Sequence, residues 1–294
     1  MTRRPYASPA AFRRALTDRI NAAARSGPWT PNQLQRQVAY DRLLERLYLL
    51  DDHWIVKGAT ALLARNIGVR GTLDIDLYRQ TGRDDAEADV RRAAGADVDD
   101  WFSFEIGAGR PINTGATRLP VDARIGQTTW IRFHLDLVGT ALRMTGQPDD
   151  VPPLARGVIP DVSQRGYRAY PLVDHVADKI AATYERYGTG RRPSTRYRDL
   201  VDLVAIITGV SVDAAAQRTA VGSEFARRGL PLPEHFDVPD RTLWTPNYAA
   251  EARRSLLDTA ATLDEALAVV RPFIDPLLQG TARGTWRPAE GTWA

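Results

Sequence analysis

Hydrophobic residues at intervals of three and four predict helices at both ends of the chain. The segment 9–24 has apolar side chains at Phe12 and Leu16, which share one face of a helix. Thr30 and Pro31 then supply an N-cap and a first-turn proline for a second helix that ends near residue 50. Later in the chain the same spacing predicts helices over residues 172–187, 197–207, 212–228 and 248–270.

Between these helices the pattern changes to short apolar runs and to alternation with a period of two. Residues 54–56 form an apolar run typical of a buried strand. In the segment 130–138, Phe133 and its apolar neighbours lie on one face, whereas His134 and Asp136 lie on the other. Further strands are predicted over residues 72–78, 101–106 and 119–125, and short helices over residues 61–67 and 84–96.

This order of elements predicts an α+β protein. Strands grouped in the middle of a chain differ from the alternating βα units of a doubly wound fold. The chain also lacks the glycine-rich dinucleotide motif and the Walker lysine motif. We expect one domain over residues 1–165, with helices before a small mixed sheet, and a helical domain over residues 166–294. A proline-rich loop at 147–160 lies near the boundary, and the last ten residues are expected to form a tail.

Composition narrows the classes of protein that this chain can belong to. It has 294 residues, of which 44% are hydrophobic and 26% are charged, as in ordinary globular proteins. No apolar run approaches the ~20 residues that a membrane helix needs. Arg13 and Arg14 interrupt the stretch where a signal peptide would be apolar, so we expect a cytoplasmic protein without a membrane partner. The absence of cysteine excludes disulfides and thiolate chemistry.

Lysine is the rarest of the charged residues. Only two of the 39 basic residues are lysines, Lys57 and Lys179, and the others are arginines. A position that keeps lysine in such a chain is a candidate for a compact ammonium, which the planar guanidinium does not replace. The net charge of +3 permits a nucleic-acid partner without requiring one.

Asp74 and Asp76 are the sharpest chemical feature of the sequence. Side chains two residues apart on a strand project from the same face, so the two carboxylates point to one place. Such close like charges are unfavourable without a cation, and carboxylate oxygens suit Mg²⁺ or Mn²⁺. Two aspartates in a surface turn are the alternative, but the flanking Leu73, Ile75 and Leu77 favour a buried strand.

A small turn precedes this acid pair. Lys57, Gly58, Ala59 and Thr60 lie between the apolar run and the predicted short helix. Glycine lets a backbone approach a ligand, and the N–H groups at the start of a helix bind phosphate. An ordinary turn capped by the hydroxyl of Thr60 is the alternative.

Asp136 is the third candidate carboxylate. Two metal ions that clamp the attacking and leaving oxygens of a phosphoryl transfer need about three acids. His134 lies on the same face, and a packed sheet histidine is the simpler interpretation of that residue.

These residues resemble the AbiEii family of nucleotidyltransferase toxins, within the DNA polymerase β-like superfamily. The run 57–62 is similar to the family pattern K-G-G-T/S-A-L, and the run 70–77 is similar to R-x-T/S-x-D-I-D-L. Residues 176–182 resemble its helical lysine motif, and residues 196–203 resemble its K/R-D-x-x-D-L motif. Both lysines therefore fall inside family motifs. The size and the arginine content are similar to those of the MenT group of mycobacterial toxins.

The resemblance implies a polymerase β-like nucleotidyltransferase domain, a helical C-terminal domain and metal-dependent transfer of nucleotides from a nucleoside triphosphate (NTP). It implies that Asp136 completes the second metal site and takes the proton of the attacking hydroxyl. Lys179 is implied to neutralise charge as pyrophosphate leaves. The implied metal ligands are Asp74, Asp76 and Asp136; the implied catalytic residues add Lys179 and Asp199; the implied nucleotide-binding residues are Lys57, Gly58, Ala59, Thr60, Arg70 and Asp202.

Two details of the resemblance stay open. Ala59 stands where the family usually has glycine or serine, and its methyl group would either crowd the triphosphate or only reduce turnover. Asp199 is favoured over Asp202 as the functional acid, because it directly follows the basic residues of its motif.

For the acceptor, the resemblance implies the 3′ end of tRNA, with a block of translation, and a cognate antitoxin encoded nearby. The basic loop residues that are candidates for contacts to RNA phosphates are Arg191, Arg192, Arg196 and Arg198. Transfer to a small hydroxylated molecule is one alternative. A nucleotide-binding module inactivated by Ala59 is the other.

Overall fold

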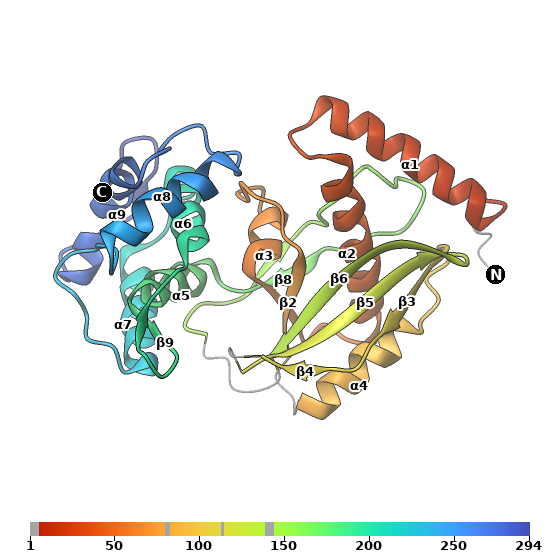
Figure 1. Ribbon diagram of the computed structural model, residues 1–294, viewed down its shortest axis with the longest axis horizontal. Coiled ribbons are helices and arrows are strands. Elements are labelled where there is room, and N and C mark those ends of the chain that lie inside the picture. Colours follow the sequence, from red (N-terminus) through yellow and green to blue (C-terminus); the bar gives the residue numbers. More distant parts are fainter. Residues whose placement is uncertain (1–5, 80–82, 113–114, 139–143) are drawn as a thin grey trace. The chain divides into compact units, whose positions relative to one another are not determined.

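The chain folds into two compact units (Figure 1). The structure is a computed structural model that describes residues 6–79, 83–112, 115–138 and 144–294. The first unit comprises residues 1–66, 71–142 and 150–169, and the second comprises residues 67–70, 143–149 and 170–294. The predicted domain boundary between residues 165 and 166 stays a prediction.

Among the described residues, a mixed sheet of eight strands forms the centre of the first unit, in the order β3-β5-β6-β2-β1-β8-β7, with β4 beside β5. Strand β2 runs parallel to β6 and antiparallel to β1. The elements are α1 (Pro9–Ser26), α2 (Pro31–Leu50), β1 (Trp54–Lys57), α3 (Gly58–Ala64), β2 (Asp74–Arg79), α4 (Arg83–Ala94), β3 (Phe102–Ile106), β4 (Arg110–Pro111), β5 (Thr117–Ile125), β6 (Thr128–Val138), β7 (Asp149–Val151) and β8 (Tyr167–Ala169).

Alternation along β5 and β6 gives this sheet one apolar and one polar face. Leu119 and Leu135, which are Cα partners on the two strands, are fully buried in the hydrophobic core. Helices α2 and α4 cover that face, as Figure 1 shows. Beyond the irregularity in the pairing of β5 and β6 near Arg124, the even-numbered residues, among them Arg118, His134 and Asp136, occupy the other face. The polar face is the one that carries the candidate acids.

Helices make up most of the second unit. They are α5 (Leu172–Tyr184), α6 (Tyr197–Gly209), α7 (Ala214–Arg228), α8 (Arg241–Arg253) and α9 (Leu263–Leu278), with the small hairpins β9 (Arg186–Tyr187) with β10 (Arg192–Pro193), and β11 (Trp286–Arg287) with β12 (Thr292–Trp293). A mixed sheet followed by a helical C-terminal part confirms the predicted α+β class. No helix in the described ranges is long and apolar enough to cross a membrane.

The sequence-based prediction of one helix over residues 248–270 is wrong. The chain forms α8 and α9 there, and the segment between them places Ala260 at a φ of +56°. Thr262 then caps α9: its hydroxyl accepts from the N–H of Glu265, whose carboxylate accepts from the N–H of Thr262. This capping box starts a new helix within a continuous apolar pattern.

The prediction of a C-terminal tail is also wrong. Residues 286–293 form the β11–β12 hairpin, and Trp286 is buried against Phe273 with 5.1 Å between the ring centroids. The indole N–H of Trp293 donates to the carbonyl oxygen of Phe273. Packing against α9 therefore orders this segment. The segment predicted as a loop at 147–160 likewise contains the short strand β7.

Candidate active site

Three aspartates lie at neighbouring positions on two adjacent strands of the first unit. Asp74 and Asp76 occupy alternate positions on β2, and Asp136 lies on β6 as the Cα partner of Asp76. The apolar neighbours Ile75 and Leu77 are fully buried, which fixes the strand and leaves the acids on its polar side. The register thus brings the three predicted metal ligands into one row.

Arg118 joins two of these acids, and sequence reasoning missed it. It lies on β5 as the Cα partner of Asp136, and its Nε and Nη2 donate to the two carboxylate oxygens of Asp136 at 2.7 and 2.6 Å. Nη2 also lies 3.4 Å from Oδ2 of Asp74. These bonds to Asp136 raise the pKa of the Arg118 guanidinium above its usual value. Alternation with Leu119 could have indicated its side, but the strand was predicted to begin at residue 119, two residues after its start at Thr117.

Two threonine hydroxyls fix the start of β2. Thr72 donates to Oδ1 of Asp74 at 2.9 Å, so both oxygens of that carboxylate have a partner. Thr60 is fully buried, and its hydroxyl donates to the carbonyl oxygen of Asp74 at 3.3 Å. This bond ties α3 to β2 directly beneath the acids.

Gly58 gives the carboxylate of Asp76 its space. A Cβ atom at position 58 would lie 1.8 Å from Oδ2 of Asp76, and the glycine has a φ of +60°. Both the close approach and the left-handed backbone therefore require glycine here. Lys57, on β1, is the Cα partner of Asp76, and Ala59 follows as a buried residue of α3.

The donor atoms of this row fit a divalent metal, although the row is not arranged around one. Within the described ranges, no group of three or more His, Cys, Asp or Glu side chains is placed to hold an ion. The fork of Arg118 accounts for this at Asp136, because it engages both carboxylate oxygens. The carboxylate oxygens lie on one face of the sheet, and Oδ2 of Asp76 packs over Gly58. Such hard oxygen ligands are the kind that Mg²⁺ or Mn²⁺ takes.

The second unit contains a buried ion cluster built from the other predicted residues. Nζ of Lys179, on α5, donates to Asp199 at 2.9 Å and to Asp202 at 2.7 Å, both on α6. Asp202 also accepts two hydrogen bonds, of 2.9 and 2.8 Å, from the guanidinium of Arg70. Asp199 lies 2.8 Å from Nε of Arg196. Each of the two aspartates therefore has two cationic partners.

Burial and neighbouring charges shift the pKa values of this cluster in opposite directions. Burial lowers the pKa of Lys179, but the charges of Asp199 and Asp202 outweigh it and the net pKa is raised. Burial raises the pKa of Asp199, but the charges of Lys179 and Arg196 outweigh it and the net pKa is lowered. The cluster is therefore held in its ionised form.

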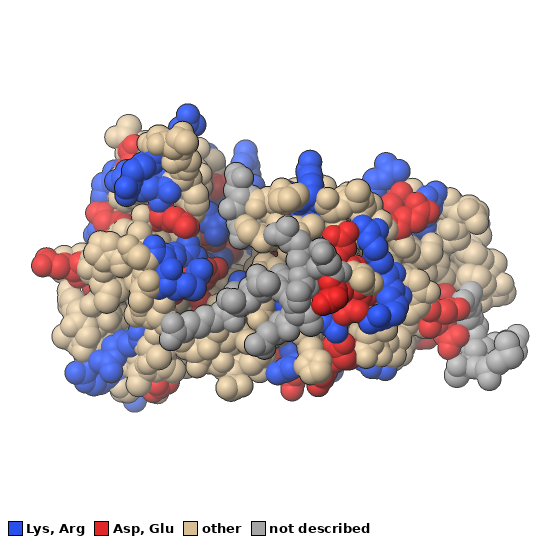
Figure 2. Space-filling model, turned by 90° about the horizontal axis from the view of Figure 1, so that it is seen from below, with Lys and Arg blue, Asp and Glu red and all other residues tan. Residues whose placement is uncertain are grey.

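The four candidate RNA-contacting arginines differ in their surroundings. Arg191 and Arg192 are exposed at the turn of the β9–β10 hairpin, where Arg191 has a φ of +46°. Arg196 forms an ion pair with Asp199, and Nε of Arg198 lies 3.0 Å from Glu251. Figure 2 shows basic and acidic side chains in small neighbouring groups on the face that it draws.

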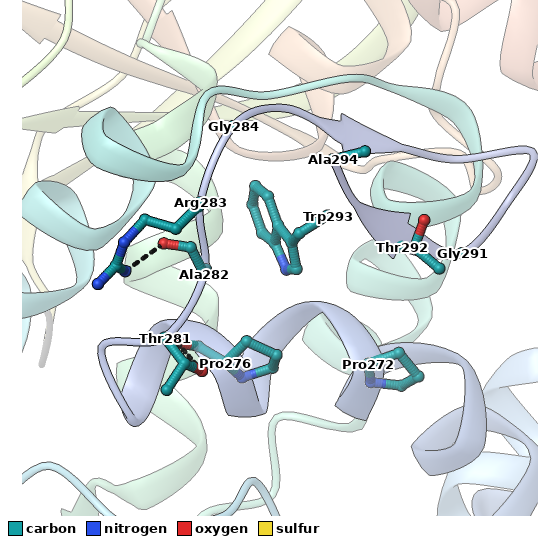
Figure 3. Close-up of a pocket in the computed structure, with 10 residues that line it drawn as sticks. All are labelled: Pro272, Pro276, Thr281, Ala282, Arg283, Gly284, Gly291, Thr292, Trp293 and Ala294. Atoms are coloured by element: carbon teal, nitrogen blue, oxygen red, sulfur yellow. Dashed lines mark hydrogen bonds between the residues drawn. The ribbon is translucent and has the colours of Figure 1, made fainter.

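One cavity of the second unit has none of this chemistry. Its volume is about 660 Å³, and it lies between α9 and the C-terminal hairpin, with the ring of Trp293 in its centre (Figure 3). Arg283 is the only charged side chain among its lining residues, and it donates to the carbonyl oxygens of Gly280 and Ala282 at 2.7 Å. No carboxylate side chain is among those lining residues.

Comparison with known proteins decides the family. Residues 42–269 match the family described as nucleotidyl transferase AbiEii toxin, type IV toxin–antitoxin system. The chain belongs to this family. Membership of the AbiEii family implies a nucleoside triphosphate as substrate and an antitoxin as partner. No curated protein matches the chain.

Solved structures similar to this AbiEii chain have low sequence identity to it. MenT4, a nucleotidyltransferase toxin from Mycobacterium tuberculosis, is 15% identical, with a TM-score of 0.52 over 91% of this chain and 99% of its own. JHP933 from Helicobacter pylori is 14% identical, with a TM-score of 0.47 over 84% of this chain and 91% of its own.

Replacement of Gly58 by alanine should disable the acid row. The new Cβ would overlap Oδ2 of Asp76, so the carboxylate must turn away. We expect nucleotide transfer to fall by about 100-fold, as for an ångström-scale misplacement of a reacting group. The matched control is Gly157→Ala, because Gly157 has a φ of +83° and no heavy atom within 4 Å of the added Cβ. Equal losses in both variants would show that backbone strain alone matters.

Removal of the cation from the buried cluster should destabilise the fold at every moderate pH. Lys179→Met leaves two buried carboxylates one partner short, which costs about 3–5 kcal/mol. We expect Lys179→Arg to lose less stability but most of the transfer activity, because the guanidinium is wider than the ammonium. The free energy of unfolding in urea measures the first effect, and labelled-nucleotide transfer measures the second.

The pH dependence of this difference follows from the two pKa shifts. The contribution of Lys179 is present below its ordinary pKa of 10.5 and is lost only as pH rises through the higher folded value. That of Asp199 is present above 3.8 and is lost only as pH falls through the lower folded value. The stability gap between wild type and Lys179→Met should therefore stay open from about pH 7 to pH 9, below the raised pKa of Lys179. A gap that closes towards pH 9 would contradict the ionised cluster.

Proposed function

We propose that this toxin transfers nucleotides from an NTP to the 3′ end of tRNA and thereby blocks translation. The observation that carries the proposal is the row of Asp74, Asp76 and Asp136 on adjacent strands. Phosphoryl transfer requires little covalent chemistry from the protein, because positioning and charge stabilisation supply most of the catalysis. An acid row of this kind can position the phosphates and stabilise their charge once a cation binds to it.

The three aspartates would hold Mg²⁺ or Mn²⁺, with Asp136 exchanging part of its bonding to Arg118 for the ion. When bound, the metal would act as a Lewis acid on the phosphate oxygens and offset their charge. Arg118 then keeps one carboxylate oxygen of Asp136 oriented through the remaining hydrogen bond. The three aspartates are thus assigned as metal ligands, and Arg118 is assigned as the residue that positions Asp136.

In the transfer step one bond to phosphorus forms, another breaks, and one proton is transferred. The 3′-hydroxyl oxygen of the acceptor attacks the α-phosphorus of the NTP, and the bond from that phosphorus to pyrophosphate breaks. Asp136 takes the hydroxyl proton. The backbone N–H groups of Gly58 and Ala59 bind the triphosphate. Lys179 is assigned to the charge of the leaving pyrophosphate because it matches the lysine motif of the family. Arg70 and Asp202 support that lysine through their own ion pair.

Arg191 and Arg192 are the proposed contacts to RNA phosphates. Both are exposed, and Tyr187 beside them is 39% exposed and available for stacking on a base. Arg196 and Arg198 are better assigned to their carboxylate partners than to RNA.

The proposal predicts metal-dependent labelling of tRNA. We expect wild type, incubated with total tRNA, Mg²⁺ and each labelled NTP in turn, to attach label to RNA, and Asp76→Asn to attach none. Asp52→Asn is the control, because Asp52 is an exposed acid of the same unit. Label found only in a small product would favour the small-molecule acceptor. No turnover of any NTP would favour an inactive binding module.

The arginine contacts predict a change in salt dependence. Removal of one phosphate contact should lower the slope of log affinity against log salt by about 0.7–0.9. We therefore expect the double variant Arg191→Ala, Arg192→Ala to bind tRNA more weakly and with a flatter slope, while NTP affinity is unchanged. Fluorescence anisotropy at several salt concentrations measures this. An unchanged slope would move the RNA surface elsewhere on the protein.

A further inference from the structure

A cavity of about 590 Å³ lies on the polar face of the sheet in the first unit, and the transfer chemistry above gives it no role. Its walls include Asp122 on β5, Arg132 and His134 on β6, and Leu73 just before β2. Its volume is within the range of roughly 300–1,000 Å³ that small-molecule sites have. All of its lining residues belong to one compact unit, so one folded body forms the whole space.

The cavity borders the acid row. His134 is two residues from Asp136 on the same face of β6, and it is the Cα partner of Asp74 on β2. Leu73 is the residue directly before Asp74. A molecule in this space is therefore adjacent to two of the three proposed metal ligands.

The acid row separates this cavity from the proposed triphosphate site. The strand order is β5-β6-β2-β1; the cavity lies over β5 and β6, whereas Gly58 directly follows β1. Attacking and leaving oxygens of a phosphoryl transfer lie roughly in line on opposite sides of the phosphorus. If pyrophosphate leaves towards Gly58, the attacking hydroxyl comes from the side of the cavity.

Two polar atoms of the cavity residues lack hydrogen-bond partners. Among the described residues, Oδ1 of Asp122 is buried and accepts no hydrogen bond, and Nε of Arg36 is buried and donates none. Nearly all buried polar groups in proteins have partners, so such atoms call for an explanation. A nucleoside supplies both kinds of partner, because its hydroxyl and amino groups donate and its ring nitrogens and carbonyl oxygens accept.

An apolar platform completes the lining. Leu73 is 66% exposed, the largest exposed fraction among the large hydrophobic side chains of the described residues. Proteins usually hold unpaired RNA bases by stacking them on aromatic rings or guanidinium planes. The ring of His134 offers such a surface next to the acids, and Leu73 adds apolar contact area.

We infer that this cavity receives the 3′-terminal nucleoside of the RNA acceptor. This inference rests on the proposed transfer to RNA. The base contacts Leu73 and His134, a hydroxyl or amino group of the nucleoside donates to Asp122, and the exposed guanidinium of Arg132 faces the preceding phosphate. The terminal hydroxyl is thereby delivered to Asp136 from the side opposite the leaving pyrophosphate.

Steady-state transfer kinetics test the assignment. For Asp122→Asn we expect the KM for tRNA to rise about tenfold, the loss typical of one hydrogen bond to a charged group, with the KM for NTP and kcat unchanged. For Leu73→Ala we expect a similar rise. An acceptor RNA whose terminal nucleotide lacks its base should bind wild type more weakly than intact RNA, and Leu73→Ala should discriminate less between the two.

Asp52→Asn serves as the matched control, and equal melting temperatures show that all variants are folded. A rise in the KM for NTP instead of tRNA would assign the cavity to the donor nucleotide and overturn the inference. Unchanged KM values for both substrates would overturn it as well. A wild-type protein that labels only a small hydroxylated molecule overturns the proposed function itself, and this result is visible before any cavity variant is made.

Discussion

Electrostatic repulsion among Asp74, Asp76 and Asp136 is the constraint around which the first unit is built. The parallel register of β2 and β6 places these carboxylates side by side, and nothing in strand geometry relieves their mutual repulsion. The surrounding residues do so: Arg118 bridges two of the acids, and the absence of a side chain at Gly58 gives the third room. The sheet thus fixes the positions of the three carboxylates, and Arg118 and Gly58 reduce the repulsion that results.

The second unit solves a similar problem in a different environment. The side chain of Arg118 is 28% exposed and that of Asp136 is 9% exposed, so water and ions reach this pair from the side of the arginine. The side chain of Lys179 is 6% exposed and that of Asp202 is 1% exposed, so this pair is shielded from both. An exposed ion pair exchanges partners at little cost, whereas a buried one does not. The first arrangement suits a site that must accept a metal and a substrate, and the second suits a charge that must stay fixed.

The sequence predicts the fold class and the acid pair, because both depend on local periodicity. Asp74 and Asp76 alternate with buried residues on one short strand, so their common face follows from a period of two. Arg118 is distant in sequence and meets the acids only through strand pairing, which no local pattern encodes. The break before Thr262 and the packing of Trp286 were missed for related reasons: a capping box interrupts an unbroken apolar pattern, and a tertiary contact orders a segment of low apparent periodicity.

The burial of Lys179 has a consequence for chemical labelling. The chain contains two lysines, and only Lys57 has appreciable exposed surface. Lys179 is also held protonated by its carboxylate partners, and a protonated amine does not react with acylating reagents. Among the side-chain amines, such reagents therefore meet essentially one, and its position is paired with Asp76 on the neighbouring strand. Amine modification of this protein thus reaches a single lysine, next to the acid row, in addition to the α-amine of the chain.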